Sequence, residues 1–363
     1  MSSTLPMPGG SDESIALVRG ALDEHGYFAD RIRTRLGLGS PRPEDAVNGD
    51  LRSRWRQQWF ASARAHAETE DPDALDVLIR LFEVGEPIAL GQARQTLGAR
   101  VVEQTVACGL VALGDGVVRP RFLVSCVGPI RVVTDTDEVA NDRAAIDGSA
   151  NPLVMPVYVE TQLFAAAVDR DPAARGLDLC TGSGVHALLL ASHCAEVVAT
   201  DVSPRAVEVA RFNTRLNAID NVTVIQGPIW APLEGRRFDI ITANPPYQPD
   251  LDDAPGSNWW GAQGRGEGVW RPIVEQLHQH LEGDGRCFII LQGLSWTDDP
   301  FVPRVRRYAP TLDVHFERFG SPELSDYRSR YQGHGMLAEA LRAADYGVLR
   351  LQHAAATDAR EVS

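Results

Sequence analysis

The sequence predicts an α/β fold with two parts: a mainly parallel, doubly wound sheet, and a smaller, mainly helical unit that precedes it. Strand-like and helical segments alternate from Leu153 onward. A glycine-rich turn follows the first strand of that series. A polar segment, Asp135 to Asn151, separates the two parts. We therefore expect a disordered tail over residues 1–13, a helical domain over 14–150 and the α/β domain over 151–363.

The bulk composition allows a large core and excludes two classes of enzyme. Apolar residues make up 44% of the 363 residues, which is enough to bury a sizeable core. All 35 basic residues are arginines. A chain without lysine cannot form a Schiff base or a Walker A site, so pyridoxal-phosphate enzymes and P-loop NTPases are excluded.

The net charge and the cysteines indicate the partners and the compartment. A net charge of −14 differs from the basic footprint of nucleic-acid enzymes, so we do not expect nucleic acid as the partner. Many arginines lie in the N-terminal third of the chain: Arg31, Arg33, Arg35, Arg42, Arg52, Arg54, Arg56 and Arg64. We expect them to form a solvated helical face; the alternative is a local basic patch that binds nucleic acid. Five scattered cysteines without a C-x-x-C pair predict no metal site. The sequence has no apolar run of membrane length and no N-terminal pattern of a secretory signal peptide. Together with these features, the scattered cysteines favour free thiols in a reducing cytoplasm.

The N-terminal unit has the pattern of helices followed by a hairpin. Residues Ser14 to Arg64 have helical spacing, broken near Gly37 to Pro43, and Ala74 to Val84 is apolar at helical spacing. Two short helical stretches lead to Gly109, and short apolar runs flank Gly114-Asp115-Gly116, which is typical of a hairpin. This order resembles a winged helix. Such a unit can bind DNA, dimerise or cover an active site, and its many acidic residues favour a homodimer or a cover over the substrate.

The C-terminal part has seven predicted strands. They are Gly176–Cys180, Glu196–Thr200, Val222–Gln226, Phe238–Thr242, Cys287–Leu291, Leu312–Phe316 and Tyr346–Leu351. Helical stretches separate most of them, as in a doubly wound sheet. Two further strands are predicted around Gly128-Pro129, before the boundary.

The first of these strands ends in a glycine-rich turn. Leu177-Asp178-Leu179-Cys180 is followed by Thr181-Gly182-Ser183-Gly184 and then by a helix that starts near Val185. Glycines let the backbone turn sharply and approach a ligand, and the first turn of the helix offers free N–H groups. The spacing Gly182-x-Gly184-x-x-Ala187 also fits a dinucleotide loop. At this point NAD and S-adenosylmethionine are equally expected as cofactors.

An acidic residue follows the next strand. The carboxylate of Asp201 can accept both hydroxyls of a ribose, a device that NAD enzymes share. After Val202, Ser203-Pro204 starts a helix with Ser203 as its N-cap. The alternative is that Asp201 only caps this helix.

A second motif lies at the end of the predicted strand Phe238–Thr242. Asn244-Pro245-Pro246-Tyr247 occupies the position where ligands of open α/β sheets bind. One candidate ligand is a planar NH2 group of an amide or a base, which is a poor nucleophile because its lone pair is delocalised. The carbonyl oxygens of Asn244 and Pro245 can accept its two hydrogens, the prolines stiffen the loop, and Tyr247 can stack on the planar group. We therefore expect Asn244, Pro245 and Tyr247 to be catalytic.

At this motif the chain resembles the NPPY methyltransferases, which include protein-glutamine N5-methyltransferases and several rRNA and DNA base methyltransferases. The resemblance covers roughly Pro152 to Gln292. It implies a Rossmann-like class I methyltransferase sheet with S-adenosylmethionine as the cofactor. It also implies cofactor contacts from Asp178, Cys180, Thr181, Gly182, Gly184, Asp201, Val202, Gly227, Pro228, Ile229 and Asn244.

Two positions depart from the pattern of that family. Cys180 stands where the family usually has the first glycine of its loop. Gly227-Pro228-Ile229-Trp230 stands where the family usually has Gly-Asp-Leu-Phe, whose aspartate accepts the adenine amino hydrogens. Because Pro228 cannot accept them, we expect either adenine contacts from the Ile229 backbone and apolar groups, or a lower affinity for the cofactor.

A glycine-rich segment with several tryptophans follows the motif, from Gln248 to Trp270. A loop at this position overhangs the acceptor pocket, so we expect a substrate lid; the alternative is a surface loop packed on its own aromatic residues. The expected substrate contacts are Pro246, Tyr247, Trp259, Trp260 and Trp270.

Together these features predict a methyltransferase that uses S-adenosylmethionine to methylate an amide or amine nitrogen of a small molecule or a protein side chain. Methylation of an rRNA or DNA base, or O-methylation of a small molecule, remains the alternative. A regulator that only senses S-adenosylmethionine is disfavoured by the intact motif.

Overall fold

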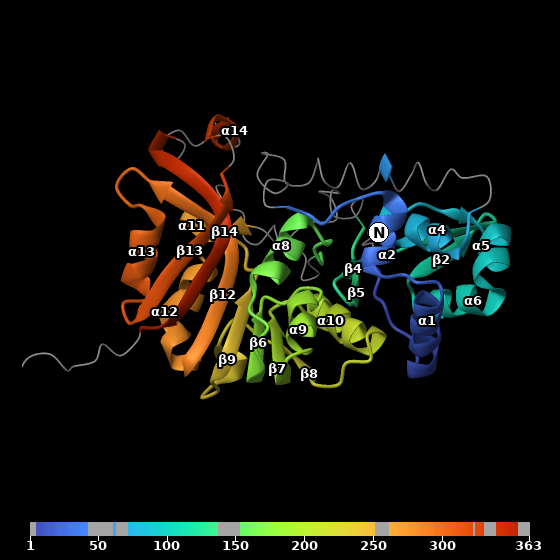
Figure 1. The fold of residues 1–363 in the computed structure, drawn as a ribbon, viewed down its shortest axis with the longest axis horizontal. Coiled ribbons are helices and arrows are strands. Elements are labelled where there is room, and N and C mark those ends of the chain that lie inside the picture. Colours follow the sequence, from blue (N-terminus) through green and yellow to red (C-terminus); the bar gives the residue numbers. More distant parts are fainter. Residues whose placement is uncertain are drawn as a thin grey trace, which may run out of the picture.

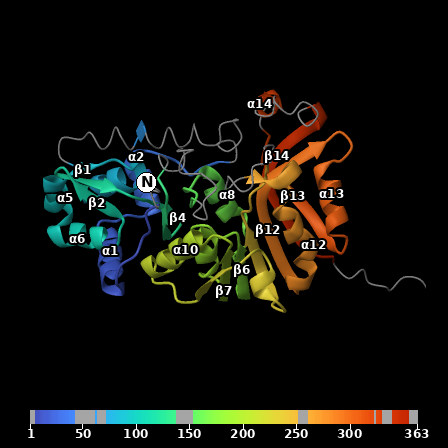
Figure 2. The ribbon, with the colours of Figure 1, turned by 180° about the vertical axis from the view of Figure 1, so that it is seen from behind.

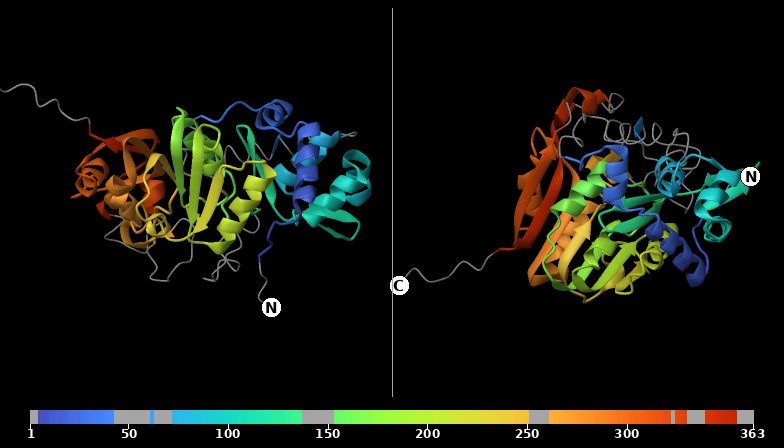
Figure 3. Two further views of the ribbon diagram at one scale, coloured as in Figure 1. Left: turned by 90° about the horizontal axis from the view of Figure 1, so that it is seen from below. Right: turned by 45° about the vertical axis from the view of Figure 1, so that its right-hand side comes forward.

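The structure of the chain is a computed structural model that describes residues 5–42, 61–62, 72–136, 153–250, 261–321, 324–329 and 339–354. The molecule is elongated, with the N-terminal helices at one end and the last strands, β13 (Leu312–Gly320) and β14 (Leu341–His353), at the other (Figures 1 and 2). The views in Figure 3 show the same order along the long axis. Within the described ranges, no helix combines the length and the apolar character that crossing a membrane requires.

The N-terminal unit consists of short helices and a small antiparallel sheet. Its elements are α1 (Asp12–Glu24), α2 (Ala29–Leu36), α4 (Ala74–Ile79), the π-helix η2 (Arg80–Val84), β1 (Ile88–Ala89), α5 (Leu90–Leu97), α6 (Ala99–Ala107), β2 (Val111–Gly114) and β3 (Val117–Pro120). The strands pair in the order β1-β3-β2. The hairpin predicted around Asp115 is β2 and β3, and the predicted helix Ala74–Val84 is α4 continued by η2.

The rest of the chain forms a hairpin and then alternating strands and helices. These elements are β4 (Leu123–Val127), β5 (Ile130–Thr134), α8 (Val159–Ala167), β6 (Ala173–Leu179), α9 (Val185–Leu190), β7 (Cys194–Asp201), α10 (Pro204–Leu216), β8 (Val222–Gln226), η4 (Ala231–Leu233), β9 (Phe238–Ala243), β10 (Gln248–Asp250), β11 (Gly261–Ala262), α11 (Gln263–Gly266), α12 (Trp270–His280), β12 (Leu281–Trp296), α13 (Phe301–Tyr308) and α14 (Leu324–Ser329), ahead of β14. All seven predicted strand segments are present.

The central sheet has seven strands in the order β13-β14-β12-β9-β6-β7-β8. Strands β12, β9, β6, β7 and β8 run parallel to one another, and β14 runs antiparallel between β12 and β13. Apolar side chains of α8, α9 and α10 pack on one face of the sheet, and those of α12 and α13 pack on the other. The predicted doubly wound α/β fold is thus confirmed for this part of the chain.

The junction between α12 and β12 differs from the prediction. The predicted strand starts at Cys287, but β12 already begins at Leu281 and includes Gly283-Asp284-Gly285. Its pairing with β9 is interrupted between Leu281 and Arg286, so the glycines form an irregular stretch within the strand. A Cβ at Gly285 would lie 2.9 Å from the Phe238 carbonyl oxygen, which explains why the strand needs glycine there.

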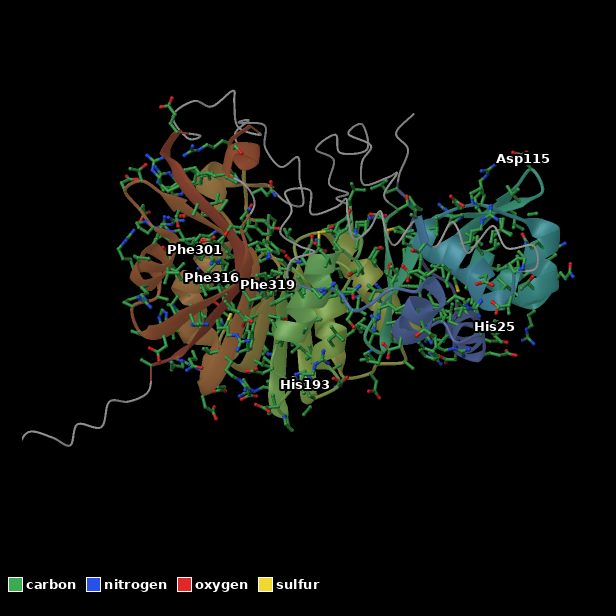
Figure 4. The ribbon with its side chains drawn as sticks, turned by 45° about the horizontal axis from the view of Figure 1, so that its top comes forward. His25, Asp115, His193, Phe301, Phe316 and Phe319 are labelled. Atoms are coloured by element: carbon green, nitrogen blue, oxygen red, sulfur yellow. The ribbon has the colours of Figure 1, made fainter. Side chains whose placement is uncertain are left out.

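The two ends of the sheet are covered in different ways. At the β13 end, Phe301 of α13 packs edge-on against Phe316 of β13, with ring centroids 5.0 Å apart (Figure 4). Towards the other end, the hairpin of β4 and β5 contacts α10. There the Asn213 side chain accepts from the Val133 N–H at 2.9 Å and donates to the Ser183 carbonyl at 2.8 Å. Asn213 thereby ties this hairpin to the glycine-rich turn.

Candidate functional site

Four neighbouring strands of the central sheet end at one level. Leu179, the last residue of β6, pairs with Ala243 of β9 on one side and with Thr200 of β7 on the other. One residue further on, Asp201 of β7 pairs with Gln226 of β8. The residues that follow or end these strands therefore leave the same carboxyl edge of the sheet: Cys180, Asp201, Gly227 and Asn244. This edge brings the predicted cofactor segments and the acceptor motif together.

A buried carboxyl group holds the glycine-rich turn in place. Asp178 is 1% exposed, and its Oδ2 accepts from the Thr181 hydroxyl at 2.5 Å and from the Ala187 N–H at 3.3 Å. Its Oδ1 accepts from the Thr242 hydroxyl of β9 at 2.8 Å. Burial raises the pKa of Asp178 to about 7, although these hydrogen bonds favour the ionised form. Asp178 thus joins the turn, helix α9 and strand β9.

The backbone of the turn explains its glycines and its one departure from the family pattern. Gly182 and Gly184 have φ values of +53° and +83°. A Cβ at Gly184 would lie 3.1 Å from the Cβ of Ala210, whereas the position of a Cβ at Gly182 is open space. Cys180 also has a positive φ, +55°, which is a left-handed conformation that glycine adopts without strain. Burial raises the pKa of the Cys180 thiol, so it remains protonated and is not a nucleophile.

Asp201 lies between the turn and the next helix. Its Oδ2 accepts from the Gly182 N–H and its Oδ1 from the Ser203 N–H, both at 2.9 Å. The N-cap of α10 is Ser203, whose hydroxyl accepts from the Ala206 N–H at 3.1 Å. Each carboxylate oxygen can accept a further hydrogen bond, so Asp201 retains capacity for two hydroxyl groups. Its neighbour Val202 is 68% exposed and presents an apolar surface beside it.

The segment that replaces the family's Gly-Asp-Leu-Phe is anchored by its tryptophan. Trp230 is buried and stacks on His280 with ring centroids 4.3 Å apart, and its indole donates to the Pro272 carbonyl at 3.2 Å. A Cβ at Gly227 would lie 2.9 Å from Pro232. Ile229 has a φ of +41°, which is rare for a β-branched residue. A strained backbone conformation persists only where the surrounding structure fixes it. At Ile229, the next residue in the chain is the buried Trp230.

The Asn244–Tyr247 motif is partly exposed to solvent. Pro245 is buried, while Asn244, Pro246 and Tyr247 are partly exposed. A Cβ at Gly266, which has a φ of +85°, would overlap the carbonyl oxygen of Tyr247. The backbone of α11 therefore crosses directly over the motif. Sequence reasoning missed this close approach, because nothing distinguishes Gly266 from the other glycines of the segment.

One part of the expected lid is a core element. Trp270 is 2% exposed, at the first position of α12, and its ring packs against Phe301 and Tyr308 at centroid distances of 5.7 and 6.0 Å. The prediction that Trp270 contacts the substrate from a lid is therefore wrong, because helix α12 turns this side chain into the core. Trp259 and Trp260 lie outside the described residues.

The edge of the sheet suits S-adenosylmethionine. The open space at Gly182 leaves room for a ligand close to the backbone, and Asp201 offers carboxylate oxygens for ribose hydroxyls. The exposed Val202 offers apolar contact to a purine ring. His186, in the first turn of α9, is instead a core residue. It is 4% exposed and packs edge-on against Phe164, and burial lowers its pKa to about 3.

Comparisons with known proteins agree with this arrangement. Residues 157–294 match the family model described as "Methyltransferase small domain". The ribosomal protein uL3 glutamine methyltransferase of Bradyrhizobium diazoefficiens is 39% identical over 158 residues, which are 40% of this chain and 49% of that protein. The release factor glutamine methyltransferase of Moorella thermoacetica is 33% identical over 191 residues, 44% of this chain and 66% of that protein.

The match covers only part of each protein, since the chain spans about half to two thirds of the length of these relatives. Among solved structures, the 16S rRNA N2 G1207 methyltransferase of T. thermophilus, in complex with AdoMet and guanosine, aligns with a TM-score of 0.40 at 16% identity, over 82% of this chain and 69% of that one. The resemblance to the NPPY-type methyltransferases is confirmed for the matched residues.

Proposed function

Since residues 157–294 are a methyltransferase small domain, we propose that the chain is a protein N-methyltransferase that transfers the methyl group of S-adenosylmethionine to the side-chain nitrogen of a glutamine. The relatives named above are glutamine methyltransferases of a ribosomal protein and of release factors. The acidic chain, with a net charge of −14, also favours a protein acceptor over a nucleic acid.

One observation carries the proposal: the acceptor motif and the cofactor turn leave adjacent strands at the same level. Leu179 pairs with Ala243, so Cys180 and Asn244 begin their loops side by side. Thr242, two residues before Asn244, is hydrogen-bonded to Asp178 at the base of the turn. A methyl donor on the turn and a nitrogen at Asn244 would therefore be held close together, which is the main requirement of a direct transfer.

The roles of the residues follow from their chemistry. When bound, S-adenosylmethionine supplies an electrophilic methyl group on its sulfonium. Asp201 and the backbone around Gly182 hold the nucleoside end. The carbonyl oxygens of Asn244 and Pro245 accept the two hydrogens of the acceptor NH2 and orient its nitrogen, and Tyr247 packs on the plane of the amide. Such positioning raises the rate without any acid or base whose pKa must lie near neutrality.

The experiment uses methyl-labelled S-adenosylmethionine, the full chain and a short capped peptide that carries one glutamine. The proposal predicts label in the peptide, and none when asparagine or glutamate replaces the glutamine or when Asn244→Ala replaces the wild type. Label in RNA or in small molecules from a cell extract, with none in the peptide, would contradict a protein acceptor.

For the N-terminal unit, we propose the role of a substrate cover or a dimer contact, with the boundary near residue 150. Its order of elements, a helix, a short strand, two helices and a hairpin, supports a winged helix. Arg215 of α10 pairs with Asp12 of α1 at 2.8 Å, so the unit rests on the methyltransferase part. Light scattering of the full chain, and binding to duplex DNA and RNA across salt concentrations, test the dimer and the nucleic-acid alternative.

A further inference from the structure

A short segment, residues 261–266, lies across the end of the acceptor motif. It consists of β11 and α11, and β11 pairs in parallel with β10, the strand that directly follows Tyr247. At the other end of the segment, a Cβ at Gly266 would overlap the carbonyl oxygen of Tyr247. The segment therefore contacts the backbone at and just after the motif in two places. Whatever fixes this segment also fixes the backbone of Tyr247.

The residue that follows the segment, Glu267, contacts two side chains of helix α13. Its Oε1 forms an ion pair with the Nε of Arg304 at 2.6 Å, and its Oε2 accepts a hydrogen bond from the Tyr308 hydroxyl at 3.0 Å. Residues four positions apart are neighbours on one face of a helix, so α13 presents both groups together. Burial raises the pKa of Tyr308, and Glu267 raises it further, so the hydroxyl remains a donor. Both oxygens of the Glu267 carboxylate are thus bound by one helix.

The guanidinium of Arg304 is held by further contacts. Arg304 is 2% exposed and donates to the carbonyl oxygens of Leu294 and Asp299, each at 2.7 Å. Its Nη1 also lies 3.4 Å from the Asp299 carboxylate. A planar guanidinium that is bound at both terminal nitrogens has a fixed orientation, so its Nε is directed at Glu267. Because Asp299 also pairs with it, the buried charge of Arg304 keeps a partner when the charge of Glu267 is removed.

A second contact holds α11 from the side of β12. The guanidinium of Arg265 lies 4.9 Å from the ring centroid of Trp296, at the end of β12, which is a distance typical of a cation–π contact. Trp296 is 3% exposed and therefore gives a rigid surface for this contact. The three anchoring residues, Trp296, Arg304 and Tyr308, all lie beyond the end of the match to the methyltransferase small domain. The cover over the motif is thus attached to a part of the chain outside that domain.

We infer that Glu267 is a positioning residue of the acceptor site: through Arg304 and Tyr308, helix α13 holds α11 against the motif and fixes the backbone of Tyr247. The inference rests on the proposed function, in which Tyr247 packs on the plane of the acceptor amide. Direct transfer requires that the acceptor nitrogen stays in line with the methyl group, and a misplacement of about 1 Å already slows such a reaction strongly. Glu267 acts through α11 and does not itself contact the substrate.

The kinetic test compares kcat and KM for the glutamine peptide in Glu267→Gln and Tyr308→Phe. The first variant removes the charge and keeps the shape, and the second removes only the hydroxyl. We expect kcat to fall about tenfold in each, with a smaller change in KM, because the acceptor still binds but is held less well for transfer. The affinity for S-adenosylmethionine, measured by calorimetry, should not change. An unchanged kcat in both variants, or a loss of cofactor affinity, would overturn the inference.

A double variant tests whether the two side chains act through their contact. Glu267→Ala removes the ion pair and the hydrogen bond together. Tyr308→Phe should then cause no further loss of kcat in the Glu267→Ala background, because the hydroxyl has no Glu267 carboxylate left to bind. If Tyr308→Phe lowers kcat equally in the wild type and in Glu267→Ala, Tyr308 acts through another contact, and the inference is overturned.

The matched control is Glu317→Gln, the same chemical change at another ion pair of the chain. Glu317 of β13 pairs with Arg350 of β14 at 2.8 Å. Two strands of the sheet lie between β13 and β9, the strand that leads into the motif. We therefore expect kcat in Glu317→Gln to equal that of the wild type. A loss of kcat as large as that of Glu267→Gln would show that the effect is not specific to α11, and would overturn the inference.

Hydrogen exchange of the full chain tests the same contact without a methyl acceptor. We expect backbone amides of residues 261–268 to exchange faster in Glu267→Gln and Tyr308→Phe than in the wild type, with no change in β6 and β7. Tyr308→Phe, the smallest of the changes, keeps the test available if a Glu267 variant does not fold. Equal exchange in the variants and the wild type would overturn the inference alone. A wild type that does not methylate the glutamine peptide would overturn the proposed function and the role of Glu267 in it, even where exchange shows that Glu267 holds α11.

Discussion

The hydroxyl of Thr242 donates a 2.8 Å hydrogen bond to the carboxyl group of Asp178. Thr242 lies two residues before Asn244, and Asp178 lies at the base of the turn that contains Gly182. A single buried carboxyl group therefore connects β9, which leads into the proposed acceptor motif, with β6, which leads into the glycine-rich turn.

The stability of the protein should depend on pH through Asp178. Burial raises its pKa in the folded chain to about 7, whereas an aspartate in the unfolded chain has a pKa of about 3.9. Between these values the folded state holds a proton that the unfolded state has released, so the contribution to the free energy of unfolding falls as pH rises from about 4 to 7. Asp178→Asn does not titrate. Urea unfolding of both proteins should show the wild type losing stability relative to the variant across this window; a constant difference would contradict the shift.

Asp201→Ala should abolish the binding of S-adenosylmethionine, because it removes the acceptor for the ribose hydroxyls. The substitution also removes hydrogen bonds to the Gly182 and Ser203 N–H groups, so a control is needed. Ser203→Ala removes the cap of α10, at a cost of about 1 kcal/mol in stability, and leaves the carboxylate intact. Calorimetry should show no binding for the first variant and near-normal binding for the second. Equal affinity in Asp201→Ala and the wild type would remove the ribose assignment.

Cys180→Gly should stabilise the fold. Cys180 has a φ of +55°, and a residue with a Cβ pays roughly 1–2 kcal/mol for this conformation, partly offset by the greater backbone freedom of glycine in the unfolded chain. Cys180→Ala is the matched control, since it removes the sulfur and keeps the Cβ. We expect the glycine variant to be more stable than the alanine variant by about 1 kcal/mol in urea unfolding. The opposite order would show that the backbone freedom of glycine in the unfolded chain outweighs the strain of the left-handed conformation.

Asn244→Ala should reduce turnover by about a hundredfold or more while the protein still binds S-adenosylmethionine. The reason is that the side-chain carbonyl no longer orients the acceptor nitrogen. Single-turnover rates with the glutamine peptide, together with calorimetry of the cofactor, measure both effects. Full activity in this variant would show that Asn244 does not position the nitrogen.

The strands and the glycine-rich turn could be predicted from the sequence because their information is local. Apolar runs ended by glycine, aspartate or Asn244-Pro245 mark both the strand and the edge where it stops. The order of the strands, with β14 antiparallel between β12 and β13, was not predicted. The departure at Cys180 was visible in the sequence, and its backbone conformation gives the physical reason for glycine at that position.

Other parts of the site depend on contacts between distant segments. A Cβ at Gly266 would overlap the Tyr247 carbonyl oxygen only because α11 lies over the motif, and no local pattern marks this glycine. The prediction for Trp270 was wrong for a related reason. Its nearness to the glycine-rich segment suggested a lid, but helical geometry and the distant Phe301 decide its burial.

The most direct test of the central claim is the mass of the glutamine peptide after incubation with the full chain and S-adenosylmethionine. We expect a peptide heavier by one methyl group in place of one hydrogen, with fragmentation locating the change on the glutamine side chain, and no change with Asn244→Ala. A methyl group on an oxygen, on the peptide backbone or on any other residue would contradict the assignment of Asn244–Tyr247 as an amide-nitrogen site.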